Sequence, residues 1–323
     1  MNELSLTVLL AGVVAGAAPI VMAAVGETIT EKAGLINLSL DGTILLSAMT
    51  AFVIACETGS PALGFAAGAV AGALVAAVVG VFSIHLRQNQ VAVGFVLTLM
   101  ARDLAYFLGN PYSRIPGPQV SPLPIPWLRE IPILGPVLFN HTLPVYFSLV
   151  LIGLSAWVIH RTRTGLRLRA VGEHPRAAYA RGIDPRRVQM AAALVGGLLV
   201  GLAGASFSLA AKPGWGRPQG AEGTGWIALA LVIFGGWDPI RAAAGAYLFA
   251  FLQVMGIYLQ GWLPSIPAQV FQVAPFPLMI FTLVLMGRAY PTGVRATPGR
   301  GGRWRRLIAG TAPSALGKPY HGD

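Results

Sequence analysis

Charged residues are scarce in this sequence. Only 11% of its 323 residues are Asp, Glu, Lys or Arg, whereas soluble globular proteins carry about 25%. Such a chain cannot cover itself with a water-facing surface, which excludes an ordinary soluble domain. Residues 62–84, 188–211 and 240–262 contain almost no ionisable group, and each run is long enough to cross a bilayer core as a helix. The sequence therefore predicts a multi-pass protein of the cell (inner or plasma) membrane.

Cysteine and recognisable catalytic groupings are also missing. Cys56 is the only cysteine, so no disulfide can form within the chain. The five histidines are scattered without a partner at ligand spacing, and we expect no metal site. Paired carboxylates and nucleophile–base arrangements are absent, which argues against an enzyme. No stretch matches the phosphate-binding pattern GxxxxGK[ST], so the chain has no ATPase site of that type.

Positive charge is concentrated in two places. The net charge is +11, with eight arginines between Arg161 and Arg187 and seven basic residues between Arg288 and Lys318. Both clusters lie between or after apolar runs, where no continuous basic face for a nucleic acid can form. The positive-inside rule places them in the cytoplasm. We therefore expect membrane lipid, and no nucleic acid, as a partner.

If both clusters are cytoplasmic and successive spans cross the membrane in opposite directions, the chain crosses nine times. The N-terminus is then outside and the C-terminus in the cytoplasm. The segment 224–237 is too short for a full crossing and fits a half-span. We expect an all-α membrane helix bundle of about 8–10 transmembrane spans with one or two half-spans. The predicted spans are 4–26, 36–55, 61–84, 90–108, 142–160, 188–211, 224–237, 240–262 and 267–287.

One transmembrane domain is expected over residues 1–290. Residues 109–141 are rich in proline, which excludes a long helix and predicts an external loop. Residues 161–187 form the longest cytoplasmic loop in this scheme. Residues 291–323 are rich in Gly, Pro and Arg, and we expect them to form a disordered cytoplasmic tail.

The order of residues in loop 161–187 predicts a short helix. Pro175 suits a first helical turn, and Gly182 suits the position just after a helix. Asp184 and Pro185 fit the N-cap and first position of the next helix. A helix of about two turns is too short to be stable alone in water, so it needs a partner surface.

The stretch GLRLRAVGEHPRAAYARGI in this loop closely resembles the cytoplasmic coupling loop of certain permease subunits. These belong to ATP-binding cassette importers, in the family for branched-chain amino acids, simple sugars and nucleosides. Three further stretches are similar to the family, in its order: TEKAGLINLSLDG at 30–42, QNQVAVGF at 88–95 and GTGWIALALVIFGGWDPIRAAAGA at 223–246. The EKAGLINLSLDG form and the chain length look most like the nucleoside-type permeases.

This resemblance implies a transmembrane permease subunit of an ATP-driven importer, which forms the path for a small polar solute. Separate ATP-binding cassette ATPase subunits would bind ATP, so the permease needs no cofactor. The resemblance also implies a second permease, expected to be a non-identical homologue, and an extracytoplasmic solute-binding protein. Nucleosides are the expected solute. Simple sugars or branched-chain amino acids are alternatives, and an ion-coupled secondary transporter is a further one.

The resemblance assigns the short helix and its flanks to contact with the ATPase. Its alanine face would permit close approach, and Arg176 and Arg181 would pair with acidic groups of the partner. The assigned residues are Gly172, Glu173, His174, Pro175, Arg176, Ala177, Ala178, Arg181 and Gly182.

Four polar residues are candidates for the translocation path. Asn37 and Asp41 lie four residues apart and share a face if that segment is helical. Alternatively, they cap a broken helix, because glycines flank them. Asn89 and Gln90 either line the path or cap the fourth span.

Other ionisable residues in or beside the spans have structural interpretations. Glu27, Glu31 and Lys32 are expected to form a solvated cluster at the inner end of the first span, with a proton relay as the alternative. Arg102 and Asp103 place two charges inside the fourth span, where pairing with neighbours is the favoured interpretation.

Small residues recur four positions apart in the third span. Such stripes let helices approach closely in a membrane, and packing within one subunit is the favoured interpretation over a dimer contact. The stripe consists of Gly64, Gly68, Gly72, Ala76 and Gly80, and Gly197 and Gly201 repeat the spacing in the sixth span.

Overall fold

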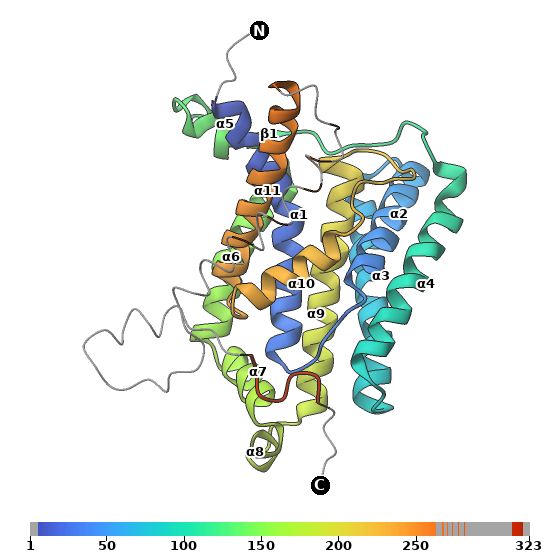
Figure 1. The fold of residues 1–323 in the computed structure, drawn as a ribbon, viewed down its shortest axis with the longest axis vertical. Coiled ribbons are helices and arrows are strands. Elements are labelled where there is room, and N and C mark those ends of the chain that lie inside the picture. The colour runs from blue at the N-terminus through green and yellow to red at the C-terminus, as the bar shows by residue number, and fades with distance from the viewer. Residues whose placement is uncertain are drawn as a thin grey trace, which may run out of the picture.

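The computed structural model describes residues 6–262 and 312–318, with five single positions between 267 and 281. These residues form a helix bundle (Figure 1). Seven of the described helices are long and apolar enough to cross a membrane. The predicted all-α multi-pass bundle is therefore confirmed. The predicted span 267–287 lies outside the continuously described residues.

The long helices lie close to the predicted spans. They are α1 (Leu6–Lys32), α2 (Leu40–Thr58), α3 (Pro61–Gly80), α4 (Gln90–Gly109), α6 (Leu143–Arg161), α9 (Pro185–Ser206) and α11 (Pro239–Trp262). Helices α3 and α9 each continue into a turn of π-helix, Val81–His85 and Phe207–Ala211. The main difference is at α1, which continues from the expected end at residue 26 to Lys32.

The short elements lie between these helices. They are α5 (Leu134–Leu138), α7 (Arg163–Glu173), α8 (Pro175–Ala180), α10 (Thr224–Phe234), strands β1 (Leu123–Pro124) and β2 (Asn140–His141), and the 3-10 turns Asn110–Tyr112 and Leu128–Glu130. Helix α10 has 11 residues. At 1.5 Å per residue it is about 16 Å long, roughly half of a bilayer core. The prediction of a short span at this place is confirmed.

Helices α1 and α9 run through the middle of the bundle, with α3 and α4 on one side and α6 and α11 on the other (Figure 1). The core contains large side chains from α1, α2 and α11 that are fully buried, such as Met22, Phe52 and Phe249. Helix α4 lies at the edge of the bundle, and only 28% of its most apolar 18-residue stretch is buried. Apolar side chains exposed on α3 and α6 fit contact with lipid.

The glycine stripe of α3 packs against other helices of the same chain. A Cβ atom at Gly72 would lie 2.3 Å from the carbonyl oxygen of Gly197 and 2.6 Å from the Cα of Gly201 in α9. A Cβ at Gly64 would lie 2.6 Å from the carbonyl oxygen of Ala51 in α2. The stripe thus brings three backbones together within one subunit, as the favoured interpretation predicted.

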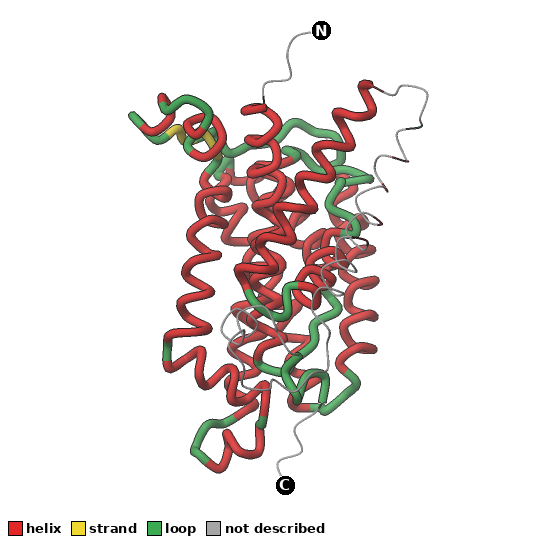
Figure 2. The backbone as a smooth tube through the Cα atoms, turned by 60° about the vertical axis from the view of Figure 1, so that its left-hand side comes forward, coloured by secondary structure: helices red, strands yellow, loops and turns green. Residues whose placement is uncertain are grey.

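The two ends of the bundle differ. One end carries the short strands, which pair antiparallel with Leu123 opposite His141, and helix α5. Figure 2 shows these strands in yellow at that end, within the segment predicted as a loop without a long helix. The opposite end carries α7 and α8 (Figure 1). The two ends therefore present different surfaces.

Candidate functional site

The predicted short helix in loop 161–187 is present as α8. Pro175 is its first residue, and Gly182 follows it with φ +79°, a left-handed conformation that favours glycine. The N–H of Gly182 donates to the carbonyl of Tyr179 at 2.8 Å, and the N–H of Ile183 donates to the carbonyl of Ala178 at 3.0 Å. These two bonds form a Schellman motif, which fixes the end of α8.

The predicted start of the next helix is confirmed as well. Pro185 is the first residue of α9, and the Asp184 Oδ1 accepts a hydrogen bond from the backbone N–H of Arg186 at 3.0 Å. The other carboxylate oxygen of Asp184 lies 3.2 Å from the Nε of Arg187. Helix α8 is therefore held between two well-defined turns at the end of the bundle.

Most of the predicted ATPase-contact residues lie on an open surface, but Ala178 does not. Ala178 is 4% exposed and faces its own chain. The outward alanines of α8 are Ala177 and Ala180, and its exposed tyrosine is Tyr179. The other exposed residues of the predicted set are His174, Arg176, Arg181 and Gly182.

Gly172 and Glu173 contact other parts of the same chain. A Cβ at Gly172 would lie 2.1 Å from the carbonyl oxygen of Lys32, at the end of α1. The Glu173 carboxylate accepts hydrogen bonds from the Ser314 hydroxyl at 2.8 Å and from its backbone N–H at 3.3 Å. Pro175 is partly buried at the start of α8. These residues anchor the loop 161–187 to the rest of the chain.

The C-terminal turn, residues 312–318, connects this loop to the segment between α1 and α2. The N–H of Ala315 donates to the carbonyl of Gly172 at 2.9 Å, and the N–H of Gly317 donates to the carbonyl of Gly34 at 3.1 Å. These seven residues belong to the segment that was predicted to be disordered. In the structure, hydrogen bonds to distant parts of the chain hold them in position. The rest of 291–323 lies outside the described residues.

The α1–α2 connection, residues 33–39, is a buried break between two helices. The Asn37 Oδ1 accepts hydrogen bonds from the Ser39 N–H at 3.1 Å and the Ser39 hydroxyl at 2.6 Å. The backbone N–H of Asn37 donates to Glu27 at 3.1 Å. Asn37 is 2% exposed. Its side chain thus forms a turn with Ser39, the N-cap residue of α2, at the break between the two helices.

Asn89 and Gln90 differ in exposure and in hydrogen-bond partners. Asn89 is exposed and caps α4, because its Oδ1 accepts a hydrogen bond from the backbone N–H of Ala92 at 3.1 Å. Gln90 is 5% exposed. Its Oε1 accepts a hydrogen bond from the backbone N–H of Ile36 at 2.8 Å. Gln90 therefore fixes the α1–α2 connection against α4.

Asp41 connects α2 to the half-span. Its side chain is buried, and its Oδ1 accepts a hydrogen bond from the Gly225 N–H at 3.2 Å, in the first turn of α10. A carboxylate at this position compensates the partial positive charge of a helix N-terminus. A Cβ at Gly225 would lie 2.2 Å from the Asp41 nitrogen. The structure thus gathers Asn37, Asp41 and Gln90 at one junction, and their role in the path stays a prediction.

The predicted solvated cluster at the end of α1 is wrong. Glu27 is 0% exposed and Glu31 is 3% exposed. The indole N–H of Trp237 donates to the Glu31 carboxylate, so this tryptophan helps to bury the cluster. The physical reason is that α1 continues past residue 26, and α9 and α10 cover its last turns.

Comparison with known proteins agrees with this architecture. The family model described as "Branched-chain amino acid transport system / permease component" matches residues 9–283. The chain belongs to this permease family. No solved structure matches it. Members of the family named below are permease subunits of ATP-binding cassette (ABC) transporters, so this permease is a transport subunit and not an enzyme.

Three relatives are similar over most of the permease. A putative glucose ABC transporter permease, TsgC13 of Haloferax volcanii, is 36% identical over 78% of each chain. The nucleoside ABC transporter permease NupC of Lactococcus lactis is 32% identical, over 88% of this permease and 94% of NupC. The guanosine ABC transporter permease NupQ of Bacillus subtilis is 31% identical, over 84% and 90%. The family is thus established, and the solute is not.

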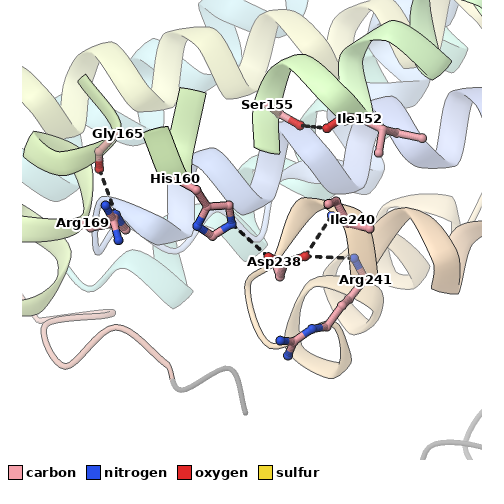
Figure 3. A network of polar contacts seen from close by, with 8 residues as sticks. All are labelled: Ile152, Ser155, His160, Gly165, Arg169, Asp238, Ile240 and Arg241. Atoms are coloured by element: carbon pink, nitrogen blue, oxygen red, sulfur yellow. Dashed lines mark hydrogen bonds and ion pairs between the residues drawn. The ribbon is translucent and has the colours of Figure 1, made fainter. Parts of the chain in front are cut away.

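A contact between His160 and Asp238 joins the end of α6, before the loop 161–187, to the start of α11 (Figure 3). The Nε2 of His160, near the end of α6, lies 3.0 Å from the Oδ2 of Asp238. The Oδ1 of Asp238 accepts hydrogen bonds from the backbone N–H groups of Ile240 at 3.1 Å and Arg241 at 3.2 Å, at the start of α11. Sequence reasoning missed this contact, although Asp followed by Pro239 is a recognisable cap.

A second polar cluster surrounds the far end of α4. The guanidinium of Arg217 lies 5.0 Å from the centre of the Tyr106 ring, and the Tyr106 hydroxyl donates to Glu222. Burial alone would raise the pKa of Glu222. Hydrogen bonds from Tyr106 and from the N–H groups of Gln219 and Gly220 instead hold that pKa below its usual range. Glu222 is therefore ionised at neutral pH.

Replacing Asp41 with alanine is expected to destabilise the permease. The Gly225 N–H would lose a charged acceptor in a buried place, which costs about 1.5–3 kcal/mol. Asp41→Asn is the matched control, because its side-chain oxygen can still accept this hydrogen bond. Thermal unfolding of the purified permease in detergent measures both. Equal melting temperatures for the wild type and Asp41→Ala would contradict the assigned contact.

Proposed function

We propose that this permease imports nucleosides and is driven by a separate ABC ATPase through α8. One observation carries the proposal: α8 is a capped, protruding helix whose sequence resembles the family's coupling loop. Its outer surface offers small and basic side chains, including Ala177, Arg176 and Arg181. Small residues permit close approach to a groove, and arginines pair with acidic groups at its rim.

The proposed orientation places α7, α8 and the C-terminal turn in the cytoplasm, with the N-terminus outside. The positive-inside rule supports it, because eight arginines lie between Arg161 and Arg187, around α7 and α8. The strands and α5 would then lie on the outer side, where a solute-binding protein would deliver its cargo.

Coupling also requires that movement of α8 reaches the bundle. Contiguous contacts support such a route. Glu173 lies two residues before α8 and is hydrogen-bonded to Ser314 in the C-terminal turn. In the same turn, Gly317 is hydrogen-bonded to Gly34 in the α1–α2 connection. From there, the backbone N–H of Ile36 donates a hydrogen bond to Gln90, the first residue of α4. A shift of the coupling loop would therefore act on the junction that holds α2, α4 and α10 together.

The proposed solute follows the relatives NupC and NupQ, whose names refer to nucleosides and guanosine. The glucose relative makes a hexose the alternative. A second, non-identical permease is proposed as partner. In support, another permease of the same Lactococcus strain, NupB, is also similar, at 26% identity over 45% of this permease and 40% of NupB. ATPase subunits and a solute-binding protein complete the proposed assembly.

Uptake by cells that express the full set of subunits tests the proposal. We expect labelled guanosine or adenosine to enter, uptake to stop when ATP is depleted, and uptake to persist when an uncoupler removes the proton gradient. Uptake of glucose or leucine alone would reassign the solute. Uptake that stops with the uncoupler but survives ATP depletion would contradict the ATP-driven mechanism.

A further inference from the structure

A carboxylate lies on the exposed face of α4, inside its candidate membrane span. The candidate span runs from Gln90 to Tyr112, with Ala101 at its centre, and Asp103 is two residues away. The Asp103 side chain is 73% exposed on this chain. Its neighbours on α4 are apolar and exposed, with Met100 at 55% and Phe107 at 76%.

This carboxylate is costly if α4 faces lipid there. An aspartate at the centre of a spanning helix costs about 2.5–3.5 kcal/mol on insertion scales, and such residues normally face a cavity or a partner group. The pairing with Arg102, at 3.4 Å, compensates only part of this cost, because the Asp103 side chain remains largely exposed. This part of α4 therefore faces water or protein.

Asp103 lines an open surface cavity of about 720 Å³. Ligand pockets for small molecules typically have about 300–1,000 Å³. The cavity is also lined by Tyr106 and Phe107 of α4, by Asn110 in the 3-10 turn that follows α4, and by Arg217 of the loop before α10. Asp103, Tyr106, Phe107 and Asn110 follow the spacing i, i+3, i+4 and i+7, so they lie on one side of α4 and of the turn that continues it.

The chemistry of this face suits an uncharged ring that carries hydroxyl groups. A carboxylate accepts strong hydrogen bonds from hydroxyls, and an amide can both donate and accept. The Phe107 ring is exposed and offers a flat apolar surface for stacking. Among the residues that line the cavity, Asp103 and Arg217 carry opposite charges, so the face has no net charge for a charged solute.

We infer that this face of α4 lines the solute path, and that Asp103, Phe107 and Asn110 bind the sugar ring or base of the solute. The inference rests on the proposed function, because it takes its ligand class, a nucleoside or a hexose, from there. The hydroxyl-bearing ring is common to both. Asp103 accepts hydrogen bonds from the ring hydroxyls, and Phe107 stacks on the flat part of the solute.

The single cysteine of the chain makes a direct test possible. In a Cys56→Ser background that still transports, Asp103→Cys is treated with a charged thiol reagent that does not cross membranes. We expect rapid modification, which guanosine or glucose slows at least several-fold. The matched control is Val150→Cys on α6, an apolar position that is 65% exposed. It is expected to face lipid and to stay unmodified.

Two results would overturn the inference. If Asp103→Cys is as unreactive as Val150→Cys, α4 is covered by lipid or by the second permease. If it reacts but no nucleoside or hexose slows the reaction, the face is wet but binds no such solute. Protection by guanosine alone or by glucose alone supports the site and selects the solute.

Transport kinetics give a second measurement. Asp103→Asn in the complete transporter is expected to raise the KM for uptake about tenfold, because a neutral amide accepts weaker hydrogen bonds than a carboxylate. An unchanged KM would contradict the assigned contact. A failure of the proposed function can be told apart from a failure of this inference. The first would appear as absent ATP-driven uptake by the wild type. The second would appear in the cysteine modification, which needs no ATPase.

Discussion

Inserting two alanines after Ala178 is expected to abolish ATP-driven uptake, while the permease still reaches the membrane. Two extra residues turn the rest of a helix by about 200° and lengthen it by about 3 Å. The insertion also separates Ala178 from Ile183, whose hydrogen bond ends α8. The outward surface of α8 would then no longer fit its partner. Uptake and the amount of protein in the membrane are measured together.

The same insertion after Gly59 is the matched control. Gly59 lies in the turn between α2 and α3, and a Cβ there would meet no atom within 4 Å. We expect near-normal uptake from this control. Normal uptake by the Ala178 insertion would remove the coupling role from α8.

Charge at Glu173 offers a finer version of the same experiment. Glu173→Arg loses the acceptor for Ser314 and places a bulky cation beside α8, so uptake should fall strongly. Glu173→Gln keeps an acceptor oxygen and should retain most of the uptake. Equal uptake by both variants would show that the contact between the coupling loop and the C-terminal turn does not matter for coupling.

The features that the sequence predicted well are local ones. A membrane span needs about 20 apolar residues in a row, so the long helices could be found from composition alone. Helix α8 was also predictable, because Pro175, Gly182 and Asp184 act within a few residues of their own position. Such signals depend little on the rest of the fold.

The features that the sequence did not predict depend on distant partners. Glu31 is hydrogen-bonded to Trp237, 206 positions away in the sequence, and Asp41 is hydrogen-bonded to Gly225, 184 positions away. Nothing near Glu31 in the sequence shows that a tryptophan covers it, so a solvated cluster was the natural expectation. The C-terminal turn has the composition of a disordered tail, yet hydrogen bonds to Gly172 and Gly34 place it.

Changing Gly72 to alanine is expected to have the largest effect on folding. Its Cβ would lie 2.3 Å from the carbonyl oxygen of Gly197, far inside van der Waals contact. This oxygen belongs to the backbone of α9 and cannot move aside as a side chain could. Helices α3 and α9 would have to move apart, and overpacking of this kind costs about 1–3 kcal/mol or more. Thermal unfolding in detergent and the yield of folded permease measure the loss.

Gly153→Ala separates this clash from the general effect of replacing a helical glycine. Gly153 lies in α6, and a Cβ there meets no atom within 4 Å. Alanine in a helix is favoured over glycine by about 0.5–1 kcal/mol, so this control should be neutral or slightly more stable. The two variants should therefore shift the melting temperature in opposite directions or leave the control unchanged. If Gly72→Ala melts as high as Gly153→Ala, the helices are not packed backbone to backbone at this point, and the stripe has another purpose.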